Sequence, residues 1–517
     1  MAHALPTLDS SQSITSTSNE RCAVFQLPSE LMNQIVRSLS PPTLTGSTFT
    51  ERLHSAFALS HTCKWWRDIV LSDPQCWSYI PCTNAHWLDE GLRRSEGALL
   101  HLFIDVSTLS SLHLTVNRLY QHVERVETLA LGEMTVDPPE LTVFAKGQIR
   151  TLMSLLSRPY PVLRQAWLLQ WSDSEPHYSF PLPIPKKIFG GRNTEAPPML
   201  THLTVSDVGF TKALYLCKAP LTHFEIVRGK LWRCVDDTVT FFRNLPQLEV
   251  FVARDCRYLA AYGILTEETY PPRGVSMPSL RHFTCVGSLE VGLEVIKLLS
   301  LPPTCDVHVT DAEPRAYDNS TEDNTSDWET TLTSVHSHLE TIRAIAMNEP
   351  TAGFSLGYRR LPGKHATEIT LKLDYMPVPG SSKATSFEVG VYIANNMIRR
   401  LFDIIPSFVD LAPQLFANTR TLRLKLTNFK TGDKVPDLWQ AAEQMPIIEK
   451  LVLAGGAAKV LCDHVKRNPS SSLGSAFPQL RTLVFDHPIS ATKLAALVWR
   501  EKGSPVEVVY SEGGASQ

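Results

Sequence analysis

A nine-residue phrase recurs along most of this chain and constrains its fold more than any other feature. The pattern is apolar-Pro-x-Leu-x-x-apolar-x-apolar. Six copies begin at Tyr160, Pro197, Leu245, Met277, Met445 and Phe477, and residues 123–131 and 218–226 fit without the proline. Proline stops a helix, and alternating apolar residues suit a short strand with one buried face. We therefore expect each phrase to end a helix and open a strand.

The segments between the phrases carry apolar residues at three- and four-residue spacing, the period of a helix with one buried face. Examples are 291–299, 437–444, 457–467 and 491–501. Strand then helix, repeated many times, predicts stacked units around a parallel sheet. The sequence thus predicts an α/β solenoid from about residue 123 to 510.

One stretch interrupts this array. Residues 311–331 are acidic and polar and contain almost no apolar side chains, so they cannot offset the entropy lost on ordering. We expect a disordered loop there. A helix over 332–347 should follow, and then a strand over 368–374, where apolar and polar residues alternate.

Composition excludes several classes of protein. The chain has 517 residues, 43% of them hydrophobic, and can bury a large core. Its 49 basic and 52 acidic residues nearly balance, without a basic cluster, so neither nucleic acid nor an anionic membrane is indicated as a partner. We find no run long enough to span a bilayer and no secretion signal. The ten cysteines have no recurrent short spacing, which favours reduced thiols in the cytoplasm or nucleus.

The N-terminal part, residues 25–80, follows a different pattern. Pro28 suits the first position of a helix, and apolar residues at four-residue spacing start at Leu31. A second apolar set, from Leu53 to Val70, stops at the Ser-Asp-Pro of residues 72–74. Three short helices account for both sets. A unit of this size carries more apolar surface than it can bury alone.

These residues resemble the F-box, the motif that docks substrate receptors onto the Skp-type adaptor of cullin-RING ubiquitin ligases. Leu27-Pro28, the Cys-x-x-Trp-Arg of residues 63–67 and Trp77 carry the resemblance. Residues 77–102 are similar to the extended form in mushroom-type fungal F-box proteins. The connection over 40–50 is longer than the usual turn. The resemblance implies that the adaptor is bound by Leu27, Pro28, Leu31, Ile35, Leu59, Cys63 and Trp66. The alternative is that these side chains form the private core of a helical subdomain packed on the repeats.

The array behind this module resembles an irregular leucine-rich-repeat domain of the kind found after F-boxes. Regular members place Asn or Cys after the strand to bond the turn backbone, and only Cys256 stands at that place here. The implied division is a disordered tail 1–22, an F-box 23–82, a linker subdomain 83–122, the repeats 123–510 and a disordered tail 511–517. In such a solenoid we expect substrate contacts on the open face, at Glu249, Val252, Arg281 and Arg481.

The two resemblances together imply a non-catalytic substrate-recognition subunit of an SCF-type (Skp–cullin–F-box) ubiquitin ligase. Its partners would be the Skp-type adaptor, the cullin-RING ligase and an unknown protein substrate, and no cofactor or metal is expected. The alternative is a non-catalytic leucine-rich-repeat scaffold whose F-box-like module acts outside proteolysis.

One motif suggests catalysis instead. Residues 353–357 match the Gly-x-Ser-x-Gly of a hydrolase nucleophile elbow, with Ser355 as the nucleophile. That elbow needs a strand before the serine and a helix after it, whereas Pro350 precedes and Pro362 follows. We therefore predict a surface loop.

Two further groups of residues have ordinary structural explanations. His61, Cys63, Cys76, Cys82 and His86 fall in one window, but their spacing is unlike that of paired zinc ligands. Buried thiols are the favoured interpretation. The aromatic residues expected in the core rather than on a binding face are Trp167, Trp171, Trp232, Phe241 and Phe242.

Overall fold

The structure is a computed structural model of the chain, and it divides into two units, Met1–Leu155 and Leu156–Gln517. It describes residues 28, 30–31, 34–35, 58–82, 85–105, 112–132, 146–168, 188–189, 196–206, 214–229, 232, 234–256, 274–287, 292, 295–296, 298–302, 304–311, 351–360, 366–375, 386–394, 419–427, 447–458, 477–485 and 507–510. The predicted helices over 332–347, 437–444 and 491–501 lie outside these residues, as does the predicted disordered loop beyond Asp311.

The first unit opens with helical segments at the places that the apolar spacing predicted. Residues 30–31 and 34–35 are helical, as are 58–62, and α3 covers Lys64–Ser72. Cys63 has an extended backbone, with φ −155° and ψ 170°, and separates α3 from the turn before it. The predicted stop is confirmed, because α3 ends at Ser72 with Asp73 as its C-terminal cap, and the short helix η3, Pro74–Trp77, follows.

An α/β arrangement follows directly. Strands β1 (Tyr79–Pro81), β2 (Leu100–Asp105) and β3 (Val126–Gly132) pair in parallel in that order. The helices are α4 (Ala85–Arg94), α5 (Leu112–Leu119), η5 (Val123–Arg125) and α6 (Lys146–Leu156), the last of which reaches the unit boundary. The parallel sheet thus begins inside the predicted F-box, and the predicted linker over 83–122 is part of the α/β unit.

Close packing between α4 and β1 holds this unit together. A Cβ atom at Gly91 of α4 would lie 3.0 Å from the side chain of Ile80 in β1, so a larger residue there would force Ile80 to shift. Ile80 and Leu88 are 1% and 0% exposed. The sheet and α4 therefore form a rigid base for the helices that precede them.

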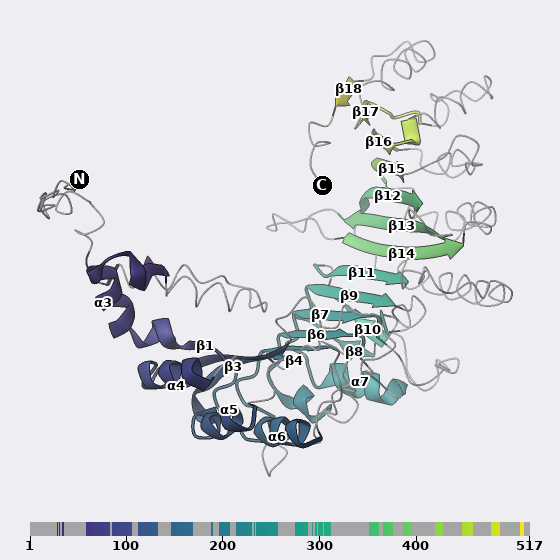
Figure 1. Cartoon of the computed structure of the whole chain (residues 1–517). Helices are drawn as coiled ribbons and strands as arrows, with labels where there is room; N and C mark the ends of the chain where they lie inside the picture. Colours follow the sequence, from purple (N-terminus) through teal and green to yellow (C-terminus); the bar gives the residue numbers. More distant parts are fainter. Residues whose placement is uncertain are drawn as a thin grey trace, which may run out of the picture. The chain divides into compact units, whose positions relative to one another are not determined.

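The second unit contains a long sheet that is mostly parallel (Figure 1). In spatial order its strands are β4 (Gln165–Leu168), β5 (His202–Ser206), β6 (His223–Val227), β7 (Val250–Arg254), β9 (His282–Gly287), β11 (Asp306–Asp311), β14 (Ser386–Ala394), β13 (Ala366–Tyr375), β12 (Thr351–Arg360), β15 (Thr421–Thr427), β16 (Lys450–Gly455), β17 (Thr482–Phe485) and β18 (Glu507–Tyr510). Only β13 runs antiparallel to its neighbours. The mixed α/β class and the mostly parallel sheet are confirmed.

The remaining described elements of this unit are short. They are η7 (Leu214–Lys218), α7 (Val235–Arg243) and a separate parallel pair of β8 (Val275–Ser276) and β10 (Leu299–Ser300). The helix predicted over 291–299 is helical at residues 292, 295, 296 and 298, and Leu299 already belongs to β10. The strand predicted over 368–374 is confirmed within β13.

All eight phrases contain a strand where the pattern predicts one. The role predicted for the proline needs correction. In five phrases the backbone N–H of the leucine donates to the carbonyl of the residue before the proline, at 3.1 to 3.3 Å: Leu163 to Tyr160, Leu200 to Pro197, Leu248 to Leu245, Leu280 to Met277 and Leu480 to Phe477. Proline therefore occupies the second place of a β-turn, which its fixed φ favours. The Met277 phrase follows strand β8, so there the proline does not end a helix.

The register aligns the apolar strand residues in two rows. One row runs Ala166, Leu203, Phe224, Phe251, Phe283, Val307, Phe387, Leu373, Phe354, Leu422, Leu451, Leu483 and Val508. The described side chains of this row are at most 6% exposed from Ala166 to Leu483. The second row lies two residues further along each strand and includes Ile226 and Leu453, both 0% exposed. The prediction that alternate strand residues enter a common core is confirmed.

Aromatic side chains fill this core. The rings of Phe224, Phe251 and Phe283 stack along the first row, with centroids 6.1 Å and 5.2 Å apart. Trp232 and Phe242 pack on Phe251 from outside the sheet. The predicted core positions of Trp232, Phe241 and Phe242 are confirmed, whereas Trp167 is half-buried and Trp171 lies outside the described residues.

Cys256 bonds the backbone as its position after the strand predicts. Its Sγ lies 3.5 Å from the carbonyl oxygen of Ile226 on the neighbouring strand. Burial raises the pKa of this thiol to about 12, so it stays protonated and donates.

Candidate functional site

The side chains predicted to bind an adaptor are accessible in the first unit. Pro28 is exposed, and Leu31 and Ile35 are 45% and 40% exposed. The other described members, Leu59, Cys63 and Trp66, are half-buried, and Leu27 lies outside the described residues. None of the six described side chains is fully buried. The alternative, in which they form the core of a separate helical subdomain, would require them to be buried.

Helix α3 adds two side chains that the sequence prediction omitted. Trp65 lies beside Trp66, with ring centroids 5.8 Å apart and an interplanar angle of 69°, and both rings are half-buried. Leu71 is 36% exposed. Ile69 and Val70, by contrast, are 7% and 1% exposed and face the interior of the unit. The helix therefore has a buried face that anchors it and an apolar face that is still partly exposed.

The turn over residues 58–62 is tied to α3 by polar contacts. The Arg67 Nε donates to the carbonyl of Ser60 at 2.9 Å, across the break at Cys63. The Thr62 hydroxyl donates to the carbonyl of Leu59 at 2.7 Å and closes the end of that turn. These bonds hold Leu59 and the α3 tryptophans on connected helical turns.

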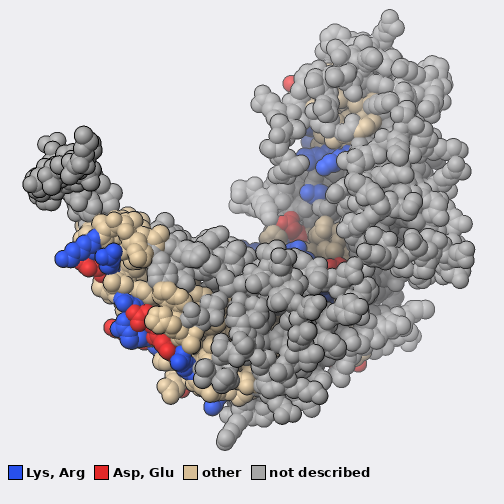
Figure 2. Space-filling model, in the orientation of Figure 1, with Lys and Arg blue, Asp and Glu red and all other residues tan. Residues whose placement is uncertain are grey.

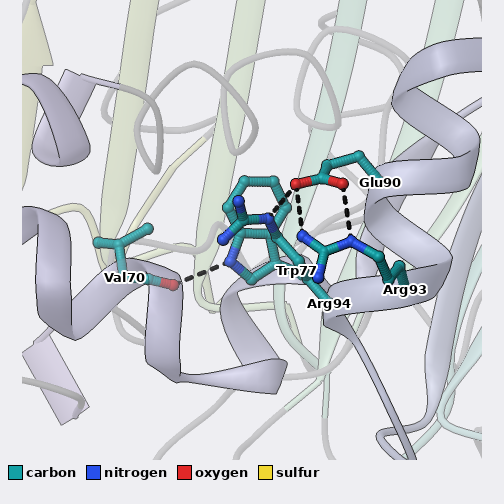
Figure 3. Close-up of polar contacts among 5 residues, drawn as sticks. All are labelled: Val70, Trp77, Glu90, Arg93 and Arg94. Atoms are coloured by element: carbon teal, nitrogen blue, oxygen red, sulfur yellow. Dashed lines mark hydrogen bonds and ion pairs between the residues drawn. The ribbon is translucent and has the colours of Figure 1, made fainter.

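Trp77 connects the end of α3 to α4 (Figure 3). Its indole Nε1 donates to the carbonyl of Val70 at 2.9 Å, and the Arg94 guanidinium lies 4.5 Å from the ring centroid. A cation over an indole face is attracted by the ring quadrupole, and the stacked guanidinium also covers the ring. Trp77 is only 8% exposed, so the F-box-like Trp acts here as a structural anchor.

Glu90 holds Arg94 in that position. Its carboxylate accepts hydrogen bonds from Arg93, at 2.8 Å, and from Arg94 (Figure 3). The hydrogen bonds from Arg93 and Arg94 lower the pKa of Glu90 to about 2, so the carboxylate stays charged throughout the ordinary pH range. Trp77 and the Glu90–Arg94 pair thus link the end of α3 to α4.

The four residues predicted to contact a substrate do not form one surface. Val252 is 9% exposed in β7, between Glu225 and Thr284 in register. Glu249 and Arg281 lie just before β7 and β9, where the Glu249 carbonyl accepts the N–H of Arg281 at 2.7 Å. Their side chains are 44% and 70% exposed and 3.9 Å apart. Arg481 is exposed before β17, many strands further along the sheet.

The sheet face opposite the buried rows carries a set of histidines instead. His202, His223 and His282 begin β5, β6 and β9 and share a register row with Val250, the first residue of β7, and with Asp306. The rings of His202 and His223 stack with centroids 5.5 Å apart, and the His282 Nδ1 lies 3.3 Å from the Asp306 carboxylate. Burial lowers the pKa of His202 and His223, and His223 lowers that of His202 further. The sequence signal was available, since these three phrases all have His at their sixth place.

The hydrolase motif does not form a nucleophile elbow. Residues 353–357 lie inside strand β12, where Ser355 is aligned with Lys372 of β13 and Arg423 of β15. The strand continues to Arg360, so no helix follows the serine. The predicted surface loop is therefore wrong. The alternation of Phe354, Leu356 and Tyr358 favours a strand more strongly than the nearby prolines favour a loop.

The cysteine and histidine window in the first unit does not assemble a metal site. His61 and His86 are exposed, Cys63 and Cys76 are half-buried, and Cys82 is buried, with a pKa raised to about 12 by desolvation. Within the described ranges no group of three or more His, Cys, Asp or Glu side chains could hold a metal ion. The prediction of a buried thiol holds for Cys82 alone in this window.

Comparison with known proteins adds no relative. No protein-family model matches the chain, and none of the curated proteins matches it. In the part of the chain that the structure describes, no helix has both the length and the apolar character needed to cross a membrane.

Proposed function

We propose that this protein is the substrate-recognition subunit of an SCF-type ubiquitin ligase. The helices before β1 act as an F-box and bind the Skp-type adaptor, and the second unit acts as an irregular leucine-rich-repeat solenoid that binds a protein client. The likeness of Leu27-Pro28 and of residues 63–67 to the F-box supports this class of partner.

The observation that carries the proposal is the exposure of apolar side chains at the F-box positions. Leu31 and Ile35 are four residues apart, hence on one helix face, and keep 45% and 40% of their surface in solvent. Burying a whole side chain of this kind gives about 1.5 to 3 kcal/mol, so docking would gain roughly 1 kcal/mol from each of the two. The half-buried tryptophans on α3 extend the same apolar character and are the residue type most often central to an interface.

The chain's contribution to ubiquitin transfer is proximity. A receptor that holds its client at one end and the ligase at the other raises the effective concentration of a client lysine near the charged conjugating enzyme. This role requires two independent binding surfaces and no catalytic group on the receptor.

Copurification with a Skp-type adaptor and a cullin tests the proposal. The double variant Leu31→Glu and Ile35→Glu places two charges in the interface, and we expect adaptor affinity to fall at least 100-fold. Leu99→Glu is the matched control, because Leu99 is 38% exposed in the same unit but lies after α4. Both proteins should melt like the wild type. Undiminished adaptor binding by the double variant would overturn the F-box assignment.

Client turnover separates a degradation receptor from a scaffold that acts outside proteolysis. A client captured with the full-length chain should accumulate when the proteasome is inhibited, and the Leu31→Glu, Ile35→Glu variant should abolish the difference. If client abundance does not change, the role in degradation is contradicted, whereas the proposal of adaptor binding is not.

A further inference from the structure

A basic surface lies on the open face of the sheet at β15 and β16. Arg423, Lys425 and Lys450 are all exposed. Leu422 precedes Arg423, and Leu424 lies between Arg423 and Lys425. These two leucines are 4% and 8% exposed and belong to the buried rows. Because successive strand residues point to opposite faces, Arg423 and Lys425 project from the open face. Figure 2 shows Lys and Arg atoms gathered there, in the upper part of the view.

The strand register gives these three cations no acidic neighbour. Arg423 is aligned with Ser355 and Val452, and Lys425 with Gly357 and Ala454. Lys450 is aligned with Thr421 and Thr482. In the same register rows, Glu388 lies three strands from Arg423, and Asp374 and Glu507 lie three and two strands from Lys450. Glu449 directly precedes Lys450 in the chain. Among the described residues, Arg423, Lys425 and Lys450 form no ion pair. Their charge is therefore available to a partner.

Aliphatic residues border the cations. Val452, Val484 and Val509 continue the register row of Arg423 across β16, β17 and β18. Val452 is half-buried and Val509 is 37% exposed, whereas Val484 is 8% exposed. The described residues on this face of β15 to β17 include no aromatic side chain on which a nucleic-acid base could stack. A surface of a few cations beside valines is complementary to a protein segment that is both acidic and aliphatic.

We propose that the Arg423, Lys425, Lys450 surface binds an extended acidic segment of the client with a carboxylate at every second residue. This inference rests on the proposed function, since it names the client class of the same receptor. Residues two apart on an extended segment are about 7 Å apart, and so are Arg423 and Lys425 along β15. Carboxylates at alternate positions share one side of an extended segment and can therefore meet Arg423 and Lys425 together. Opposite charge also steers the encounter and makes the association sensitive to salt.

Fluorescence anisotropy with the full-length chain tests this inference. The probes are a labelled peptide of alternating Glu and Val and the matched peptide of alternating Gln and Val. We expect only the acidic peptide to bind, with an affinity that falls at least tenfold between low and high salt. Arg423→Glu with Lys450→Glu should weaken binding at least tenfold. Arg243→Glu, an exposed arginine on α7, is the control and should bind as the wild type does.

Three outcomes would contradict the inference. They are equal binding of the two peptides, no binding of either, and undiminished binding by the charge-reversal variant. A labelled single-stranded oligonucleotide that binds more tightly than the acidic peptide, and loses affinity in the same variant, would assign the surface to nucleic acid instead. Adaptor copurification is measured on the same proteins and depends on Leu31 and Ile35, so failure of the peptide test leaves the receptor proposal standing.

Discussion

The helical surface of the first unit and the open sheet face of the second unit differ in how their residues are brought together. On the first, Leu31, Ile35 and the α3 tryptophans come from short segments near one end of the chain and are mostly apolar. On the second, Arg423 and Lys450 come from strands separated by more than twenty residues, and only the register places them side by side. The first kind of surface can be found from a motif, and the second requires the pairing of strands.

A core substitution in the second unit tests most strongly whether the two surfaces have independent cores. Phe251 is 1% exposed and contacts the rings of Phe224, Phe283, Phe241, Phe242 and Trp232. Phe251→Ala should destabilise the second unit by about 3 to 5 kcal/mol, because it leaves a cavity that rigid neighbours cannot fill.

Hydrogen exchange measured on peptides from each unit checks that prediction. Protection should fall in strands β5 to β9 and stay unchanged in β1 to β3, and adaptor copurification should persist. A loss of adaptor binding in Phe251→Ala would show that the two surfaces share one cooperative core.

These two regions also show what could be predicted from sequence. The β-strands of all eight phrases and the stop of α3 after Ser72 were predictable, because they depend on residue spacing and on proline, which are local properties. The strand through Ser355 was missed because Pro350 and Pro362 were given more weight than the alternation between them. The predicted substrate contacts Glu249 and Arg281 lie just before strands β7 and β9, because the pattern alone does not say which unspecified place enters the strand.

Trp77 gives a smaller test, confined to the first unit. Trp77→Phe keeps most of the apolar ring but removes the N–H that donates to Val70. Losing one buried hydrogen bond and leaving that carbonyl unsatisfied should cost about 1 to 3 kcal/mol. Because this bond fixes the end of α3, adaptor affinity should fall as well, whereas acidic-peptide binding should not change. Urea unfolding followed by both binding assays measures the effect, and equal loss in the two assays would refute the separation of the surfaces.

The smallest effect distinguishes the His202 and His223 pair of the second unit from the Glu90 cluster of the first by their response to acid. His202 and His223 have pKa values lowered from 6.5 by burial, with Glu249 opposing the shift at His202. Near and below pH 6.5 the two histidines therefore bind more protons in the unfolded chain than in the folded one. The second unit should lose stability as pH falls below about 6.5. Glu90 in the first unit has a pKa lowered from 4.5 to about 2, so its contribution is complete above about pH 4.5 and is lost only as pH falls towards 2. Hydrogen exchange between pH 7 and 5 should thus show weakening in β5 and β6 but little change in α4. His202→Gln with His223→Gln should flatten the response of the second unit, and a response that survives this double variant would place its origin in other groups.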